Sequence, residues 1–230
     1  LVVAVAGEEE LRHYYEAIAG DLGISCRAFP HAEEVPADLR DARMLISNWR
    51  SIPYVGGFSG SKILITGGDV IGGYENYCVN EVWQNPVSVG VLQGLMRKCT
   101  SDKPRLLCIE DDTNLAFLVE SLVGDMGVEP VMAKHVDAGL PLLPSVHAVL
   151  SDVYQEKFTN KDGYWMLAEA RKIYDGRQLP FALMSGKIFD EEKKGDALLL
   201  PKIFSEKQLV ATVRSLISKS LYASVFPKFL

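Results

Sequence analysis

The sequence has few cysteines, and none of them are paired at a spacing that points to a metal or redox site. The four are Cys26, Cys78, Cys99 and Cys108, and no two stand in a CxxC arrangement. Zinc sites and thioredoxin-type redox sites usually take their cysteines in such pairs. We therefore expect four reduced thiols in a cytosolic protein, because structural disulfides are rare in that compartment.

Long apolar runs are also missing. No stretch approaches the roughly 20 apolar residues that a membrane-spanning helix needs. The opening segment LVVAVAG is short and lacks the basic region of a signal peptide. We expect this chain to have no direct membrane contact and to be cytoplasmic, which includes the cytosolic end of a membrane-anchored sensor. Since it opens with Leu1 instead of Met, we expect a fragment of something longer, although processing would also explain that start.

Positive charge is scarce as well. The chain has 24 Lys and Arg against 30 Asp and Glu, which gives a net charge of −6, and its basic residues are scattered. A nucleic-acid-binding surface needs a basic stripe that neutralises phosphates, so we expect no nucleic-acid partner. Apolar residues make up 48% of the 230 residues, which is enough to fill the cores of two ordinary domains.

From residue 105 onward, short apolar strands alternate with amphipathic helices. The pattern predicts strands at 105–110, 128–133, 147–152, 179–186 and 196–202. It predicts helices at 114–127, 162–176 and 205–221, the last with Ser205 as its N-cap. Such alternation is typical of a parallel sheet with helices on both faces. In that arrangement the functional crevice lies at the carboxyl ends of the strands.

The first hundred residues repeat this pattern. Strands are predicted at 2–6, 24–29, 42–48, 61–68 and within 76–86, and helices at 8–23 and 87–98. The polar segment that follows ends in proline and has no periodicity, as a linker would. We expect an α/β protein with two doubly wound, flavodoxin-like five-stranded parallel sheets in tandem. The predicted parts are a first domain at 1–100, a linker at 101–104, a second domain at 105–220 and a tail at 221–230.

Charged and hydroxyl side chains stand at the ends of the strands in the second half. They are Glu110, Asp111, Asp112, Asp152, Ser185 and Lys202. Several carboxylates on one rim cannot all stay ionised without a counter-charge. Mg²⁺, which prefers oxygen ligands, and the ammonium of Lys202 would supply that charge.

Such a site suits phosphoryl transfer. Asp152 can attack a phosphoryl group as a carboxylate nucleophile and form an aspartyl phosphate. Mg²⁺ and Lys202 would neutralise the phosphoryl oxygens, while Ser185 donates a hydrogen bond to one of them. Gly186 would leave room for the incoming group. Ordinary surface charge is the plainer interpretation, but four residue types at four matching strand ends argue against it.

The second half resembles a receiver domain of two-component signalling. The matching stretches are CIEDD, VLSDV followed by KDGYWML, LPFALMSG and LLLPKIF, in the right order over about 115 residues. The resemblance implies that Asp152 is the phosphoacceptor, Ser185 the hydroxyl switch and Lys202 the site lysine. It also implies a Mg²⁺ site formed directly by Asp111, Asp152 and the backbone carbonyl of Tyr154, with Glu110 acting through water.

The sequence departs from the receiver pattern on one face. The loop QEKFTNKDG is about three residues longer than usual. The segment between Ser185 and Lys202 is about five residues short, so we expect its helix to be truncated or irregular. Leu199 stands where an aromatic residue is usual, and Ile203 replaces a proline. These changes argue against a standard aromatic-switch dimer and leave the phosphorylation chemistry intact.

The first half repeats the predicted fold of the second half but lacks the residues of its phosphorylation site. Ala6 and Gly7 stand where the second half has its acidic pair, Asn48 stands in place of the phosphoacceptor, and Asn85 in place of the lysine. An amide is a poor nucleophile and a poor Mg²⁺ ligand. We expect a degenerate pseudo-receiver over residues 1–100 that serves as a scaffold, dimer contact or spacer.

The leading hypothesis is the tandem receiver portion of a hybrid sensor histidine kinase, with the kinase core upstream. Asp152 would accept a phosphoryl group from a kinase histidine, in the same or another chain, and relay it to a histidine phosphotransfer protein. One alternative is a stand-alone response regulator that acts by phosphorylation-dependent protein binding, with a homodimer as one possible form. Another is a structural adaptor in which neither copy is phosphorylated. Beyond self-phosphorylation and dephosphorylation, enzymatic activity stays open.

Overall fold

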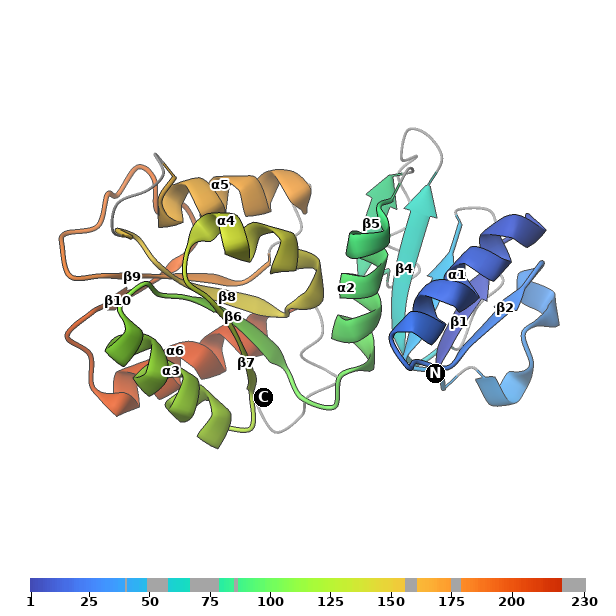
Figure 1. Cartoon of the computed structure of the whole chain (residues 1–230), viewed down its shortest axis with the longest axis horizontal. Coiled ribbons are helices and arrows are strands. Elements are labelled where there is room, and N and C mark those ends of the chain that lie inside the picture. The colour runs from blue at the N-terminus through green and yellow to red at the C-terminus, as the bar shows by residue number, and fades with distance from the viewer. Residues whose placement is uncertain are drawn as a thin grey trace. The chain divides into compact units, whose positions relative to one another are not determined.

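The computed structural model describes residues 1–39, 41–48, 58–66, 79–84, 87–155, 161–174 and 179–220. The chain divides into two compact units, Leu1–Thr100 and Ser101–Leu230. Each unit is built on one parallel sheet with its own helices (Figure 1). No helix among the described residues is long and apolar enough to cross a membrane.

The first unit contains five parallel strands in the order β2-β1-β3-β4-β5. The strands are β1 (Val2–Val5), β2 (Cys26–Phe29), β3 (Met44–Ser47), β4 (Ser61–Thr66) and β5 (Glu81–Gln84). The helices are α1 (Glu9–Asp21) and α2 (Val89–Thr100), with two short 3₁₀ turns, η1 (Ala32–Glu34) and η2 (Ala37–Leu39), after β2. Strands β1 and β3 are buried along their whole length, as is typical of strands covered on both faces.

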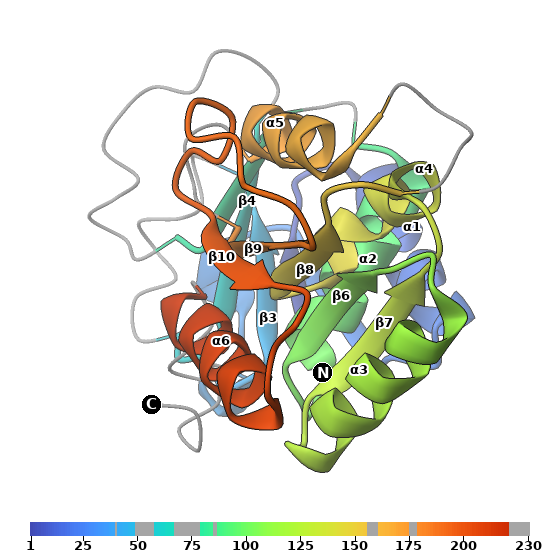
Figure 2. The same ribbon diagram turned by 90° about the vertical axis from the view of Figure 1, so that its left-hand side faces the viewer.

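The second unit has the order β10-β9-β8-β6-β7, again all parallel (Figure 2). Its strands are β6 (Arg105–Ile109), β7 (Glu129–Ala133), β8 (Ala148–Asp152), β9 (Phe181–Ser185) and β10 (Leu198–Pro201). Its helical segments are α3 (Thr113–Asp125), α4 (Val136–Gly139), the 3₁₀ segment η5 (Leu140–Ser145), α5 (Gly163–Ile173) and α6 (Glu206–Lys219).

Numbered along the chain within each unit, both sheets have the strand order 2-1-3-4-5. This is the flavodoxin-like doubly wound order, so the predicted fold class is confirmed. In the second unit the order reverses beside β6, whose neighbours are β7 and β8. A crevice for ligands opens at such a reversal, outside the carboxyl ends of the strands.

Helices cover both faces of the second sheet. Helices α3 and α6 lie on one face and α4 and α5 on the other (Figures 1 and 2). Val119 of α3 and Val213 of α6 pack in one buried cluster with Leu106, Leu150 and Met184 of the strands. Helix α6 begins with the predicted cap, because the Ser205 hydroxyl accepts from the Gln208 backbone N–H.

Two elements between β7 and β8 were not predicted from the sequence. Helix α4 has only four residues, and the prolines at 141 and 144 interrupt the helical pattern of η5. The helix between β9 and β10, which was expected to be truncated or irregular, is absent, since the described residues 186–197 form bends and turns and no helix. The expectations for Asn85 and for the tail at 221–230 concern residues outside the described ranges.

Candidate functional site

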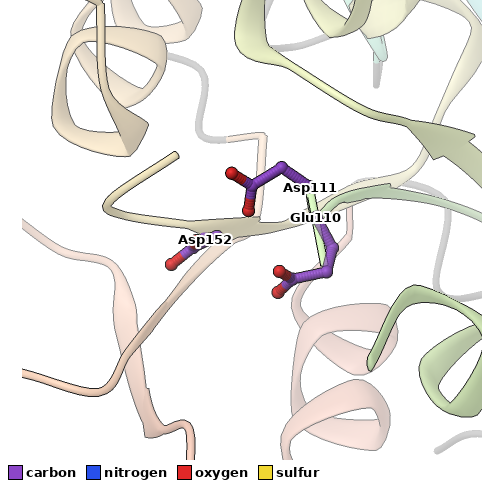
Figure 3. Close-up of side chains that lie close together, drawn as sticks. All are labelled: Glu110, Asp111 and Asp152. Atoms are coloured by element: carbon purple, nitrogen blue, oxygen red, sulfur yellow. The ribbon is translucent and has the colours of Figure 1, made fainter. Parts of the chain in front are cut away.

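Three carboxylates meet at the carboxyl ends of β6 and β8. Glu110 and Asp111 directly follow β6, and Asp152 is the last residue of β8. The register pairs Ile109 with Ser151, which places these two strand ends side by side. One oxygen from each of the three carboxylates lies within 4.8 Å of the others (Figure 3). The structure therefore brings together three of the predicted site residues.

Lys202 supplies the positive charge. Its backbone N–H donates to the Ser185 carbonyl at 2.8 Å, which places the residue at the end of β10 beside β9. Its Nζ donates to Asp152 Oδ2 at 2.9 Å and to Glu110 Oε1 at 3.0 Å. Because both carboxylates are almost fully buried, bulk water cannot take the place of the ammonium as their hydrogen-bond donor.

Burial dominates the electrostatics of the cluster. Desolvation raises the pKa of Glu110 and of Asp152, even though hydrogen bonds from Lys202 act in the opposite direction. Desolvation alone would lower the pKa of Lys202, but its hydrogen bonds to Asp152 and Glu110 outweigh it and raise that pKa. With all three carboxylates ionised, one ammonium leaves two negative charges unbalanced.

The donor set fits a divalent cation such as Mg²⁺. Glu110 Oε2 is buried and has no hydrogen-bond partner among the described residues. Glu110, Asp111 and Asp152 offer only oxygen ligands, and their excess charge matches one Mg²⁺. The Tyr154 backbone N–H donates to Asp152 Oδ1 at 3.2 Å, whereas ligation by its carbonyl stays a prediction.

Ser185 lies at the end of the neighbouring strand β9. The register pairs Asp152 with Met184, one residue before Ser185. Ser185 is buried, and its Oγ accepts from the Lys187 backbone N–H at 2.9 Å. No described atom lies within 4 Å of where a Cβ on Gly186 would stand, so the space beside Ser185 is open.

Gly163 holds the loop after Asp152 close to the start of α5. A Cβ at this position would stand 2.5 Å from the Asp152 carbonyl oxygen and 3.0 Å from the Val153 Cα. The Gly163 backbone N–H donates to the Val153 carbonyl at 3.0 Å, and the preceding Asp162 caps α5. In the sequence, the Asp162-Gly163 pair stands out only as part of the receiver-like pattern. The close approach to the backbone of Asp152 and Val153 gives the physical reason for the glycine.

Asp112 has a different role from the other strand-end acids. It is exposed and caps α3, and its Oδ1 accepts from the backbone N–H groups of Asn114 and Leu115 at 2.9 and 3.0 Å. These hydrogen bonds lower its pKa. The side chain therefore serves the helix and lies outside the carboxylate cluster.

The corresponding strand ends of the first unit carry neutral residues. Ala6 and Gly7 follow β1, and Asn48 follows β3. They line a hollow of about 260 Å³, and Glu8 is the one acidic residue among the described residues that line it. The Arg12 guanidinium donates to the carbonyls of Ala6 and Gly7 at 2.9 and 2.8 Å. No group of three acidic or other metal-ligating side chains lies there within the described residues.

No protein-family model and no curated protein matches the chain. Among solved structures, the chemotaxis protein CheY4 of Vibrio cholerae is 19% identical over 50% of this chain and 98% of its own, with a TM-score of 0.43. The receiver domain of NtrX from Brucella abortus is 22% identical over 48% and 97%, with a TM-score of 0.42.

A longer neighbour is described as a "probable two-component system response regulator/GGDEF domain protein". It is 16% identical over 94% of this chain and 97% of its own, with a TM-score of 0.45. At such low identities and TM-scores, the case for a function rests on the geometry of the site.

Proposed function

We propose that the second unit is a phosphoacceptor receiver domain of a two-component system, with Asp152 as the residue that is phosphorylated. One observation carries this proposal. Asp152 is 2% exposed at its side chain, contacts the Lys202 ammonium at 2.9 Å, and lies beside two further carboxylates at the point where the strand order reverses. Buried carboxylates with perturbed pKa values in a cleft are candidates for chemistry rather than for stability.

The reaction would be a phosphoryl transfer from a phosphohistidine. An oxygen of Asp152 attacks phosphorus as the P–N bond breaks, and the electron pair of that bond returns to the imidazole nitrogen. Lys202 holds Oδ2, and the Tyr154 N–H orients Oδ1, which we assign as the attacking oxygen. Ser185 would turn its hydroxyl to a phosphoryl oxygen. Bound Mg²⁺ would offset negative charge on the transferring group.

The rim of the site supports a protein as the phosphodonor. Phe117 and Leu118 on α3 are 73% and 48% exposed, and Ile203, directly after Lys202, is 98% exposed. Large apolar side chains exposed around a polar site are typical of protein-interaction surfaces. We propose a histidine kinase domain as donor and a histidine phosphotransfer protein as the next acceptor. The chain would then be the receiver portion of a hybrid histidine kinase, with a silent first unit.

Phosphorylation in vitro tests the proposal. The protein is incubated with Mg²⁺ and acetyl phosphate, and the aspartyl phosphate is located by mass spectrometry. We expect label on Asp152, none in Asp152→Asn, and normal labelling in Asp112→Asn. The last variant is a matched control, because it removes a neighbouring carboxylate and asparagine still caps a helix. Equal labelling of the wild type and Asp152→Asn would refute the proposal.

A stand-alone regulator is the second candidate. Ile188, in the turns between β9 and β10, is 94% exposed and offers a further apolar side chain for a protein contact. A regulator of this kind would change its oligomeric state or partner binding on phosphorylation without passing the group on. Transfer from phosphorylated Asp152 to a phosphotransfer protein would favour the relay over this candidate.

A further inference from the structure

Two side chains connect the loops that follow β8 and β9. The Lys187 Nζ lies 4.5 Å from the centre of the Tyr154 ring, a cation–π contact. Each residue is also tied to the site through its backbone. The Tyr154 N–H donates to Asp152 Oδ1, and the Lys187 N–H donates to Ser185 Oγ. The pair therefore lies at the rim beside both the nucleophile and the hydroxyl.

Lys187 differs from the lysines around it. Lys193 and Lys194 form ion pairs with acidic residues of their own turn, and Lys202 is shared by two buried carboxylates. Lys187 forms no ion pair with any described residue. Its ammonium is exposed and held only by an aromatic ring that is itself on the surface. At an exposed position such a contact is weak, so the ammonium can move to a stronger partner.

A phosphoryl group on Asp152 would be that partner. It carries about two negative charges in place of the single charge of the carboxylate, next to a cluster that already has more carboxylates than cations. A phosphate oxygen attracts an ammonium far more strongly than an aromatic face does. Since the Lys187 backbone is already hydrogen-bonded to Ser185, only its side chain has to turn.

We propose that Lys187 is a second phosphate-binding cation, which leaves Tyr154 when Asp152 is phosphorylated and thereby releases the tyrosine ring. This inference rests on the proposed function of Asp152. The released ring would change the protein surface two residues from the phosphorylated side chain. It would give the unit an aromatic reporter although β10 carries Leu199, an aliphatic residue, in place of an aromatic one.

Binding of beryllofluoride with Mg²⁺, which mimics the phosphoryl group on Asp152, tests the new contact. We expect Lys187→Ala to weaken this binding about fivefold, the effect of one unit charge a few ångströms away in water. Lys187→Arg keeps the charge and should restore most of the affinity. Lys172→Ala is the matched control, because it removes an exposed lysine from α5, and it should bind as the wild type does.

The tyrosine ring is followed by fluorine NMR of protein containing 3-fluorotyrosine. Of the nine tyrosine resonances, Tyr154 is identified by its loss in Tyr154→Phe. We expect beryllofluoride to move the Tyr154 signal of the wild type toward its position in untreated Lys187→Ala. A Tyr154 signal that does not respond, or a Lys187→Ala variant with wild-type affinity, would overturn the inference.

The two proposals fail in different ways. If neither the wild type nor Asp152→Asn binds beryllofluoride, the assignment of the phosphoacceptor is wrong and the role of Lys187 falls with it. If binding depends on Asp152 but not on Lys187, the phosphoacceptor stands and only the second cation is refuted.

Discussion

At the scale of single residues, the proposed role of Asp152 comes with an energetic cost. Its position next to Lys202, Glu110 and Asp111 is the one that the proposed phosphoacceptor needs. The same burial raises its pKa, which means that the folded unit holds the protonated form better than the unfolded chain does. Ionisation at neutral pH therefore destabilises the metal-free fold at this position.

Asparagine at this position should stabilise the metal-free protein. We expect Asp152→Asn to raise the free energy of unfolding by about 1 kcal/mol, the usual size of a single-substitution effect, because asparagine removes a buried charge. Urea denaturation without Mg²⁺ measures the difference. Adding Mg²⁺ should stabilise the wild type more than the variant, because the variant lacks one of the three carboxylates. A variant less stable than the wild type without metal would contradict this account.

Cys26 shows burial acting on a thiol. Desolvation, followed by the charge of Glu16, raises the pKa of Cys26 from 9.0 to about 12. At pH 8 roughly one thiol in 10,000 would then be ionised, against about one in ten for a thiol with the unshifted pKa of 9.0. We expect iodoacetamide to modify Cys26 roughly a thousandfold more slowly in the native protein than in urea. Peptide mass spectrometry reads this site separately from the other cysteines, and equal rates in both conditions would refute the prediction.

The residue types of the site could be read from the sequence, but their protonation could not. The order of strand ends placed Glu110, Asp111, Asp152 and Lys202 on one rim, and the structure brings their side chains together. The sequence did not show that Asp112 turns away to cap α3. Nor did it show the contact between Lys187 and Tyr154, which depends on the course of two loops.

At the scale of elements, the junction between β8 and α5 is fixed by a glycine. We expect Gly163→Ala to lower the free energy of unfolding by about 2 kcal/mol, because its Cβ would meet backbone atoms that cannot turn aside. Phosphorylation of Asp152 should slow as well, since the displaced atom is the carbonyl oxygen of that residue.

A second glycine provides the matched control. Gly124 lies in α3, and no described atom stands within 4 Å of a Cβ placed there. Gly124→Ala should therefore stabilise the protein by about 0.5 kcal/mol, because alanine is the better helix former. Thermal unfolding of both variants checks the opposite signs. If the two substitutions had the same effect, the close approach at Gly163 would not be the cause.

Elements were predictable where periodicity was strong. Strands β8 and β9 are continuous apolar runs, and α3 and α6 have helical spacing that ends in clear caps. Helix α4 is too short to show a period. An irregular segment between β9 and β10 was predictable for another reason, because the chain there is about five residues shorter than in the receiver pattern.

At the scale of the whole molecule, the two units share a strand order and differ in chemistry. Each has its own buried core, so the fold of the first unit does not depend on the charges that it lacks. Asn48 stands where the second unit has Asp152, but Ala6 and Gly7 offer no side-chain ligand for a metal. The first unit therefore differs from the site of the second unit at several positions, not one.

Introducing a single aspartate into the first unit should therefore not create a phosphorylation site there. In a protein that carries Asp152→Asn, we expect Asn48→Asp to remain unlabelled by acetyl phosphate and Mg²⁺. The Asp152→Asn background ensures that any label reports the first unit. Phosphorylation of residue 48 at a rate near that of wild-type Asp152 would show that the acidic pair is dispensable.

The guanidinium of Arg12 would hinder the formation of a metal site in the first unit. It is already anchored on the carbonyl oxygens of Ala6 and Gly7 at the end of β1. A carboxylate introduced at either position would form an ion pair with Arg12. That ion pair would compete with metal binding for the carboxylate oxygens. A metal site in the first unit would therefore require the loss of Arg12 as well as the gain of acidic side chains.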